Sequence, residues 1–135
     1  MKLTQTYRAN RKSGMTLLEL TVVILVLLSL ISILFVGARA WKKGSDRSAN
    51  IMNIRNCQQA MRGHQNLYNL EEGTGAFTQT DLEDYLTMPT PPAAGLTYTP
   101  GTVVTAPGVL WLTVAATGDT VLADYMPPDA DYADW

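Results

Sequence analysis

The sequence is poor in the residues that build catalytic and metal centres. Among its 135 residues there is one cysteine, Cys57, and one histidine, His64. A single cysteine excludes an internal disulfide framework and a cysteine-rich zinc module. The chain also lacks the GxSxG, P-loop, HExxH and CxxC patterns that carry hydrolase, nucleotide-binding, metalloprotease and redox chemistry. We therefore expect that it is not an enzyme, that Cys57 is a small core residue and that His64 lies at a surface or groove.

Basic residues are missing from the second half of the chain. All ten Lys and Arg lie between Lys2 and Arg62, whereas ten of the twelve Asp and Glu lie between Glu71 and Asp134. Residues 1–62 hold ten basic residues and two acids and so carry +8, while residues 63–135 carry −10. Because no basic residue follows Arg62 to hold phosphate groups, we expect no nucleic-acid partner.

One long stretch contains no charge at all. The nineteen residues from Leu20 to Ala38 are uncharged and read LTVVILVLLSLISILFVGA. As an α-helix they span roughly 28 Å, close to the thickness of the hydrocarbon core of a bilayer. A domain of this size has no core large enough to surround such a helix, so the sequence predicts a membrane-inserting helix. Four basic residues precede it and four follow, so the positive-inside rule does not orient it.

Two kinds of processing fit this N-terminal region. The first is an ordinary secretory signal peptide, because Ala38-Arg39-Ala40 matches the small-x-small cleavage pattern and cutting there releases a chain that begins at Trp41. Two features disfavour it. The apolar stretch is longer than the usual apolar region of a signal peptide, and Glu19 lies where that region should begin.

The second kind of processing depends on the segment Gly14-Met15-Thr16-Leu17-Leu18-Glu19-Leu20, which follows a short basic leader without acids. This segment resembles the processing site of type IV prepilins and type II secretion pseudopilins. The resemblance implies a leader of residues 1–14, cleavage between Gly14 and Met15 by a prepilin peptidase, and N-methylation of Met15. Met15 replaces the usual Phe, and Ser13 replaces the Lys or Arg that often precedes the Gly. Glu19 becomes the fifth mature residue, as in that family.

The position of Glu19 agrees with this resemblance on physical grounds. A carboxylate at the end of an apolar helix is costly unless it is paired. Cleavage after Gly14 creates a free α-amine at Met15, which is mostly cationic at pH 7. The resemblance implies that Glu19 of one subunit pairs with the Met15 amine of its neighbour and sets the register of assembly. The alternative is that Glu19 only snorkels to the headgroup region.

The remaining sequence predicts a small α+β domain. A half-apolar stripe predicts that the helix continues to about Tyr68, and the run from Glu71 to Gly75 predicts its end. The residues of this stripe are Ile51, Ile54, Cys57, Gln58, Met61, His64, Gln65 and Tyr68. Thr80-Asp81-Leu82-Glu83 matches a capping box that opens a short helix. Strands are expected at residues 96–99, 109–114 and 120–123. The expected fold is pilin-like: a long N-terminal α-helix packed on a small antiparallel sheet of three or four strands. Its parts are the leader (1–14), the membrane and filament-core helix (15–40) and a small globular domain that includes the rest of the helix (41–135).

The acidic tail leaves two interpretations open. Its carboxylates have the oxygen ligands that Ca²⁺ takes, and major pseudopilins, whose endings this tail faintly resembles, carry a calcium site in their C-terminal loops. The spacing does not match an EF-hand, and no Gly is present for a tight loop. A solvated acidic tail is therefore favoured over a calcium site. The candidate ligands are Asp124, Asp129, Asp131 and Asp134.

These observations predict a structural subunit of a pilin-like filament. The chain is expected in the cytoplasmic membrane as a single-pass protein with its C-terminal domain on the periplasmic or extracellular side, and then in the filament. The implied partners are the lipid bilayer before assembly, other pilin-like subunits in homo- or hetero-filaments, the prepilin peptidase, and an assembly ATPase with its membrane platform. A type II secretion pseudopilin is preferred over a type IV pilus subunit, because many type IV pilins close a C-terminal loop with two cysteines. A secreted or membrane-anchored binding module is the alternative from a different class.

Overall fold

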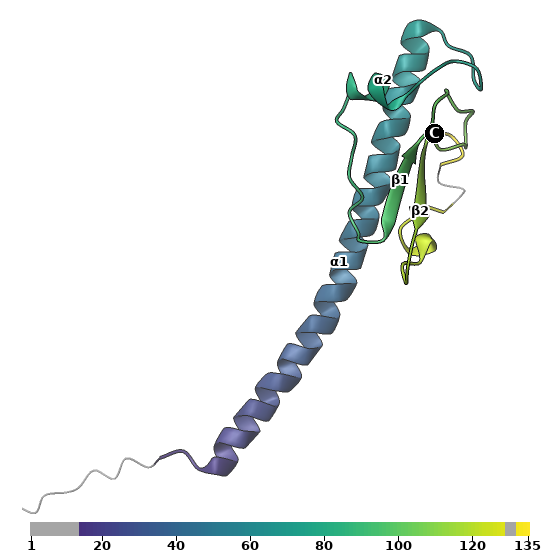
Figure 1. Ribbon diagram of the computed structural model, residues 1–135. Helices are drawn as coiled ribbons and strands as arrows, with labels where there is room; N and C mark the ends of the chain where they lie inside the picture. Colours follow the sequence, from purple (N-terminus) through teal and green to yellow (C-terminus); the bar gives the residue numbers. More distant parts are fainter. Residues whose placement is uncertain (1–13, 129–131) are drawn as a thin grey trace, which may run out of the picture. The chain divides into compact units, whose positions relative to one another are not determined.

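A computed structural model of the chain describes residues 14–128 and 132–135. The elements, in chain order, are α1 (Leu17–Tyr68), α2 (Gln79–Glu83), β1 (Leu96–Pro100), β2 (Leu112–Ala116) and the 3₁₀ helix η1 (Leu122–Asp124) (Figure 1). The chain divides into two compact units, the first ending at Arg39 and the second covering Ala40–Trp135. The helix α1 contributes residues to both units.

The hydrophobic core belongs to the second unit. One stripe of α1 supplies Ile54, Cys57 and Met61, which are fully buried and recur at the three- and four-residue spacing of a helix face. Tyr68, expected on the same stripe, is 60% exposed and lies outside the core. The other buried members of the cluster come from the rest of the second unit and are Phe77, Leu82, Val104, Trp111 and Leu112.

The strands β1 and β2 form a two-stranded antiparallel sheet, paired from Leu96 opposite Ala116 to Pro100 opposite Leu112. This confirms the α+β arrangement of a long helix on a small antiparallel sheet, but the described residues form fewer strands than the three or four expected. Residues 120–123, expected to return as a strand, lead into η1 instead. The hydroxyl of Thr120 donates to the Ala94 carbonyl at 3.2 Å, which holds the chain at the end of the sheet and off its edge.

The short helix α2 begins two residues earlier than the sequence motif predicted. The backbone N–H and the hydroxyl of Thr78 both donate to Oδ2 of Asp81, each at 2.7 Å. These bonds lower the pKa of Asp81, first through the backbone N–H of Thr78 and then through its hydroxyl. The capping box is therefore Thr78 with Asp81, and Thr80 lies inside the helix. Buried Phe77 precedes the cap and anchors this start against the core.

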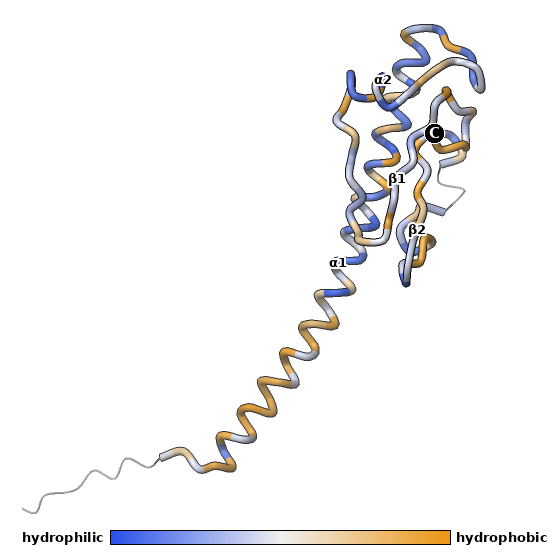
Figure 2. Tube along the Cα trace, viewed as in Figure 1, coloured by the Kyte–Doolittle hydropathy of each residue, from blue (hydrophilic) through white to orange (hydrophobic). Residues whose placement is uncertain are grey.

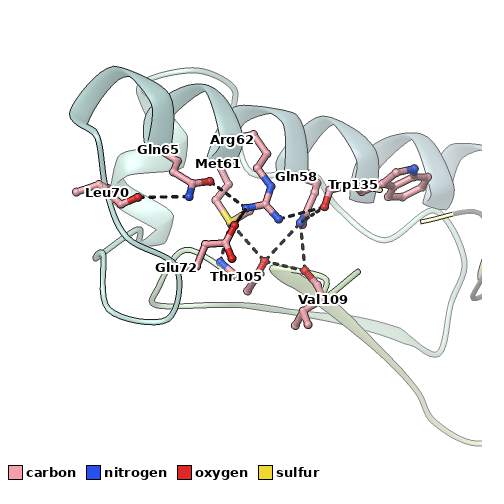
Figure 3. A network of polar contacts seen from close by, with 9 residues as sticks. All are labelled: Gln58, Met61, Arg62, Gln65, Leu70, Glu72, Thr105, Val109 and Trp135. Carbon is pink, nitrogen blue, oxygen red and sulfur yellow. Dashed lines mark hydrogen bonds and ion pairs between the residues drawn. The ribbon is translucent and has the colours of Figure 1, made fainter. Parts of the chain in front are cut away.

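Two buried amides fix α1 against the rest of the second unit. Gln58, 2% exposed, accepts a hydrogen bond from the Trp111 backbone N–H at 2.9 Å. It also donates to the Val109 carbonyl at 3.1 Å (Figure 3). Asn50 donates to the Tyr125 carbonyl at 2.9 Å and accepts from the Tyr98 hydroxyl at 2.7 Å. No buried side-chain nitrogen or oxygen in the described residues lacks a partner. These bonds determine which face of α1 is buried and which is exposed.

Candidate processing site and membrane segment

The bond between Gly14 and Met15 lies just before α1 in a segment that is neither helix nor strand. Met15 is 70% exposed, and a Cβ placed on Gly14 would meet no atom within 4 Å. A peptidase needs an accessible, non-helical bond, and exposed irregular segments are where chains are cut most readily. The rest of the predicted leader, residues 1–13, lies outside the described residues.

The first turn of α1 is closed by a capping box. The backbone N–H of Thr16 donates to Oε2 of Glu19 at 3.0 Å, and the backbone N–H of Glu19 donates to the Thr16 hydroxyl at 3.3 Å. Such a pair satisfies two N–H groups that a helix start leaves without partners, and a cap of this kind is worth roughly 0.5–2 kcal/mol. The sequence predicted that Glu19 contacts a neighbouring subunit or the lipid headgroups, and the contact with Thr16 was not predicted. The Thr-x-x-Glu spacing that predicts the cap was nevertheless present in the sequence.

The apolar part of α1 is exposed along its length within the described residues. Its most apolar window has a mean hydropathy of 3.0, and none of that window is buried. Figure 2 shows the continuous apolar colouring of this part of α1. Its length and composition are compatible with a single-pass membrane anchor. Signal sequences, and the core helices of soluble proteins, share the same length and composition.

The hydroxyl groups within this segment bond to the helix backbone. Thr21 donates to the Leu18 carbonyl at 2.8 Å, and Ser29 donates to the Val26 carbonyl at 2.7 Å. Ser32 donates to the carbonyl of Leu28 at 2.8 Å. A hydroxyl that is satisfied in this way does not need water, so it adds little cost in lipid or in a packed bundle of helices.

The basic residues that follow the apolar segment are mostly paired within the second unit. Lys42 bridges to Asp46 at 2.7 Å, and Lys43 bridges to Asp124 at 2.6 Å. The hydrogen bond that Lys43 donates to Asp124 raises the pKa of Lys43 above its ordinary value. Arg47 donates to a carbonyl of the tail at 3.3 Å. The Lys43 bridge joins residues that are 81 positions apart and ties the tail to α1.

The described carboxylates of the tail do not form a calcium site by themselves. Asp124 accepts from Lys43, and exposed Asp134 lies at the rim of a groove beside α1. Within residues 14–128 and 132–135, no group of three or more His, Cys, Asp or Glu side chains is placed to hold a metal ion. The other two candidate ligands, Asp129 and Asp131, lie outside the described residues.

The lone cysteine and the lone histidine both have structural surroundings. Cys57 is fully buried, and the loss of water around it raises the pKa of its thiol to about 11, which keeps the thiol protonated and unreactive. The Nδ1 atom of His64 lies 3.0 Å from the Tyr85 hydroxyl, and the ring of His64 lies 4.4 Å from that of Tyr68. His64 therefore packs at an aromatic edge beside α2.

No protein-family model, curated protein or solved structure matches this chain. The class that the residues define is an α+β protein with a pilin-like arrangement, in which one long N-terminal helix packs on a small antiparallel sheet. A functional proposal therefore depends on the segment around Gly14 and on the geometry of the two units.

Proposed function

We propose that the chain is a structural subunit of a pilin-like filament, and that a type II secretion pseudopilin is the preferred member of that class over a type IV pilus subunit. One observation carries this proposal. An accessible Gly14–Met15 bond lies immediately before an exposed apolar helix that has a single carboxylate, Glu19, in its first turn. This arrangement agrees with cleavage after Gly14 and with use of the helix for assembly.

The exposed apolar helix needs a cover. Apolar patches larger than a few hundred Å² are rarely left in water and mark contacts with lipid or with protein. The apolar helix is surrounded by the lipid bilayer before assembly and by the same helices of other subunits afterwards. Contacts between different surfaces of identical subunits produce a filament when the rotation from one subunit to the next does not close into a ring.

The geometry of Glu19 is compatible with pairing between subunits. Its Oε2 atom accepts from Thr16 within the chain, while its Oε1 atom has no partner among the described residues. An ionised carboxylate accepts several hydrogen bonds at once. Glu19 is therefore able to keep its cap and to accept from the Met15 amine of a neighbouring subunit, once cleavage has created that amine.

The choice of pseudopilin depends on the cysteines. The only cysteine of the chain, Cys57, is buried in the core and has no second thiol to pair with. A disulfide-closed C-terminal loop of the kind many type IV pilins have is therefore excluded for this sequence. The proposed partners are the prepilin peptidase, the assembly ATPase with its membrane platform, and other pilin-like subunits.

The first test is the N-terminus and the intact mass of the full chain recovered from cells that contain a prepilin peptidase. We expect a chain that begins at Met15 and is one methyl group heavier than its sequence. As a control, Gly14→Leu is expected to leave the leader attached without changing membrane insertion. A chain that begins at Trp41 would instead mean a secreted domain, and an uncut chain would mean a plain membrane anchor; either result refutes the proposal.

A further inference from the structure

The second unit contains a polar groove along one face of α1. The groove has a volume of about 400 Å³, with Arg55, Gln59, Gly63 and Asn66 of α1 on one side and Asp134 and Trp135 on the other. We call it the arginine groove. A Cβ built on Gly63 meets no atom within 4 Å, so the floor of the groove is open to an incoming side chain.

The wall of the groove is held in place by the network drawn in Figure 3. The main-chain oxygen of Trp135 accepts from Arg62 at 3.1 Å and from Gln58 at 3.5 Å. Arg62 also lies 3.6 Å from Glu72, so its charge is already paired within the chain. Trp135 is thus seated against α1, and its ring forms one side of the groove.

Arg55 forms no ion pair with a carboxylate among the described residues of the second unit. Lys42, Lys43 and Arg62 pair with carboxylates, and Arg47 donates to a main-chain carbonyl. The guanidinium of Arg55 instead lies over the Trp135 ring, 5.4 Å from its centroid. Arg55, with the exposed amides of Gln59 and Asn66, offers a group of donors that suits a carboxylate.

The acidic surface that fits this groove lies on the other side of the same helix. Glu83, Asp84 and Tyr85, which we call the α2 corner, are exposed at the end of α2. The Tyr85 hydroxyl lies 3.0 Å from His64, which places the corner on the His64 side of α1. At about 100° per residue, Arg55 and Asn66 lie about 160–180° around the helix from His64.

The carboxylates of the α2 corner are available to bind a cationic side chain of another molecule. The carboxylate of Asp84 has no hydrogen-bond or ion-pair partner among the described residues, and that of Glu83 accepts only from the Gln79 amide at 2.8 Å. Residues 63–135 contain no Lys or Arg, so no nearby part of the sequence supplies a cation. Tyr, Trp and Arg, which the two surfaces bring together, are the residues enriched at the centres of protein interfaces.

We propose that the arginine groove of one copy of this chain receives the α2 corner of a second copy. The contact joins two different surfaces on opposite sides of α1, so it is heterologous and repeats from copy to copy. The inference rests on the proposed function, because it names a contact between neighbouring subunits of the filament. Other acidic partners of the groove are alternative outcomes of the test.

The first test exchanges the charges in the full chain. Arg55→Glu and Asp84→Arg are each expected to raise the concentration needed for assembly roughly two- to fivefold, as the loss of one exposed ion pair predicts. The double variant Arg55→Glu with Asp84→Arg is expected to restore assembly. The matched control combines Arg55→Glu with Asp119→Arg, since Asp119 is an exposed acid in a turn away from α2, and this combination is not expected to restore it.

The second test crosslinks the two surfaces with a short bis-maleimide. The full chain carrying both Gln59→Cys and Asp84→Cys is expected to give a ladder of oligomers. The pair Gln59→Cys with Asp119→Cys, and each single variant, are expected to give no ladder beyond a dimer. The native Cys57 does not compete, because it is fully buried.

The outcomes separate this inference from the proposed function. Filaments of chains that begin at Met15, with no ladder and no charge rescue, would overturn the contact and leave the filament proposal standing. A ladder in membranes without filaments would support the contact and refute the filament. If neither filaments nor a crosslinked ladder form, the filament proposal and the contact between copies are both refuted. If Arg55→Glu weakens only the binding of an added acidic protein, the groove serves another partner and the contact between copies is overturned.

Discussion

The replacement Gln58→Leu should destabilise the second unit although leucine is apolar and close to glutamine in size. Gln58 is a buried amide on the core stripe of α1, and its oxygen accepts from the Trp111 backbone N–H at 2.9 Å. Trp111 is itself fully buried, so no water replaces the lost acceptor. The substitution therefore leaves an N–H group without a partner in the core.

The size of the effect follows from the bonds that are lost. An unsatisfied buried donor costs about 1–3 kcal/mol. The Val109 carbonyl loses its bond from Gln58 but still accepts from the Thr105 hydroxyl at 2.7 Å, so its share is small. The longer bond to the Trp135 oxygen, at 3.5 Å, adds little. We expect a loss of about 2–3 kcal/mol in the free energy of unfolding.

The assay is urea unfolding of the full chain in a mild detergent, followed by tryptophan fluorescence. Gln59→Leu is the matched control, because Gln59 is the exposed neighbour of Gln58 and its replacement should change stability by less than about 0.5 kcal/mol. A Gln58→Leu variant within about 0.5 kcal/mol of the wild type would refute the reasoning, since such small changes are typical of unconstrained surface sites. The dependence on urea should stay the same in all three proteins, which keeps the comparison to stability alone.

Three further predictions concern charge. Glu19→Ala should leave membrane insertion and cleavage largely intact but impair filament assembly. Glu19→Gln keeps an oxygen for the cap without the charge and should impair assembly as well. A normal filament yield from the glutamine variant would show that the cap alone is sufficient and would refute the pairing between subunits. Because the pKa of Asp81 is lowered from 3.8 in the folded state, its bonds with Thr78 contribute their full stability above pH 3.8. That stability is lost as the pH falls from 3.8 through the lower pKa of the folded state. The melting temperature should therefore fall less steeply below pH 3.8 for Asp81→Asn than for the wild type. Millimolar Ca²⁺ should leave the melting midpoint unchanged, as a solvated tail requires, and a raised midpoint would instead identify a bound ion.

The long helix and its apolar part could be predicted from the sequence because both depend on local pattern. The uncharged run after Leu20 specifies a helix by its length alone, and the stripe of Ile54, Cys57 and Met61 specifies the buried face. The predicted cleavage after Gly14 also depends on local sequence alone, because the motif is defined by the order of residues around Gly14. The start of α2 was misplaced by two residues because Thr78 and Thr80 are equivalent by type, and only the packing of Phe77 selects between them.

The tail and the third strand depend on contacts that are distant in sequence. Nothing near Asp124 indicates that Lys43, 81 residues away, takes its carboxylate. The departure of residues 120–123 from the sheet depends on the bond from Thr120 to Ala94, which joins segments 26 residues apart. The position of Trp135 also depends on contacts that are distant in sequence, because its main-chain oxygen accepts from Arg62 and Gln58. Without these bonds the arginine groove has only one side.

The buried amides on α1 also decide which surface the helix leaves outside. An apolar stripe tolerates a shift of the helix against its partners, whereas an amide that must meet particular N–H and carbonyl groups does not. A shift of α1 by one residue would turn its buried face by about 100° and would part Gln58 from the Trp111 N–H. Arg55 and Gln59 keep their outward positions because Asn50 and Gln58 are bonded where they are. The same register therefore sets the stability of the core and the position of the groove in which a second copy is proposed to bind.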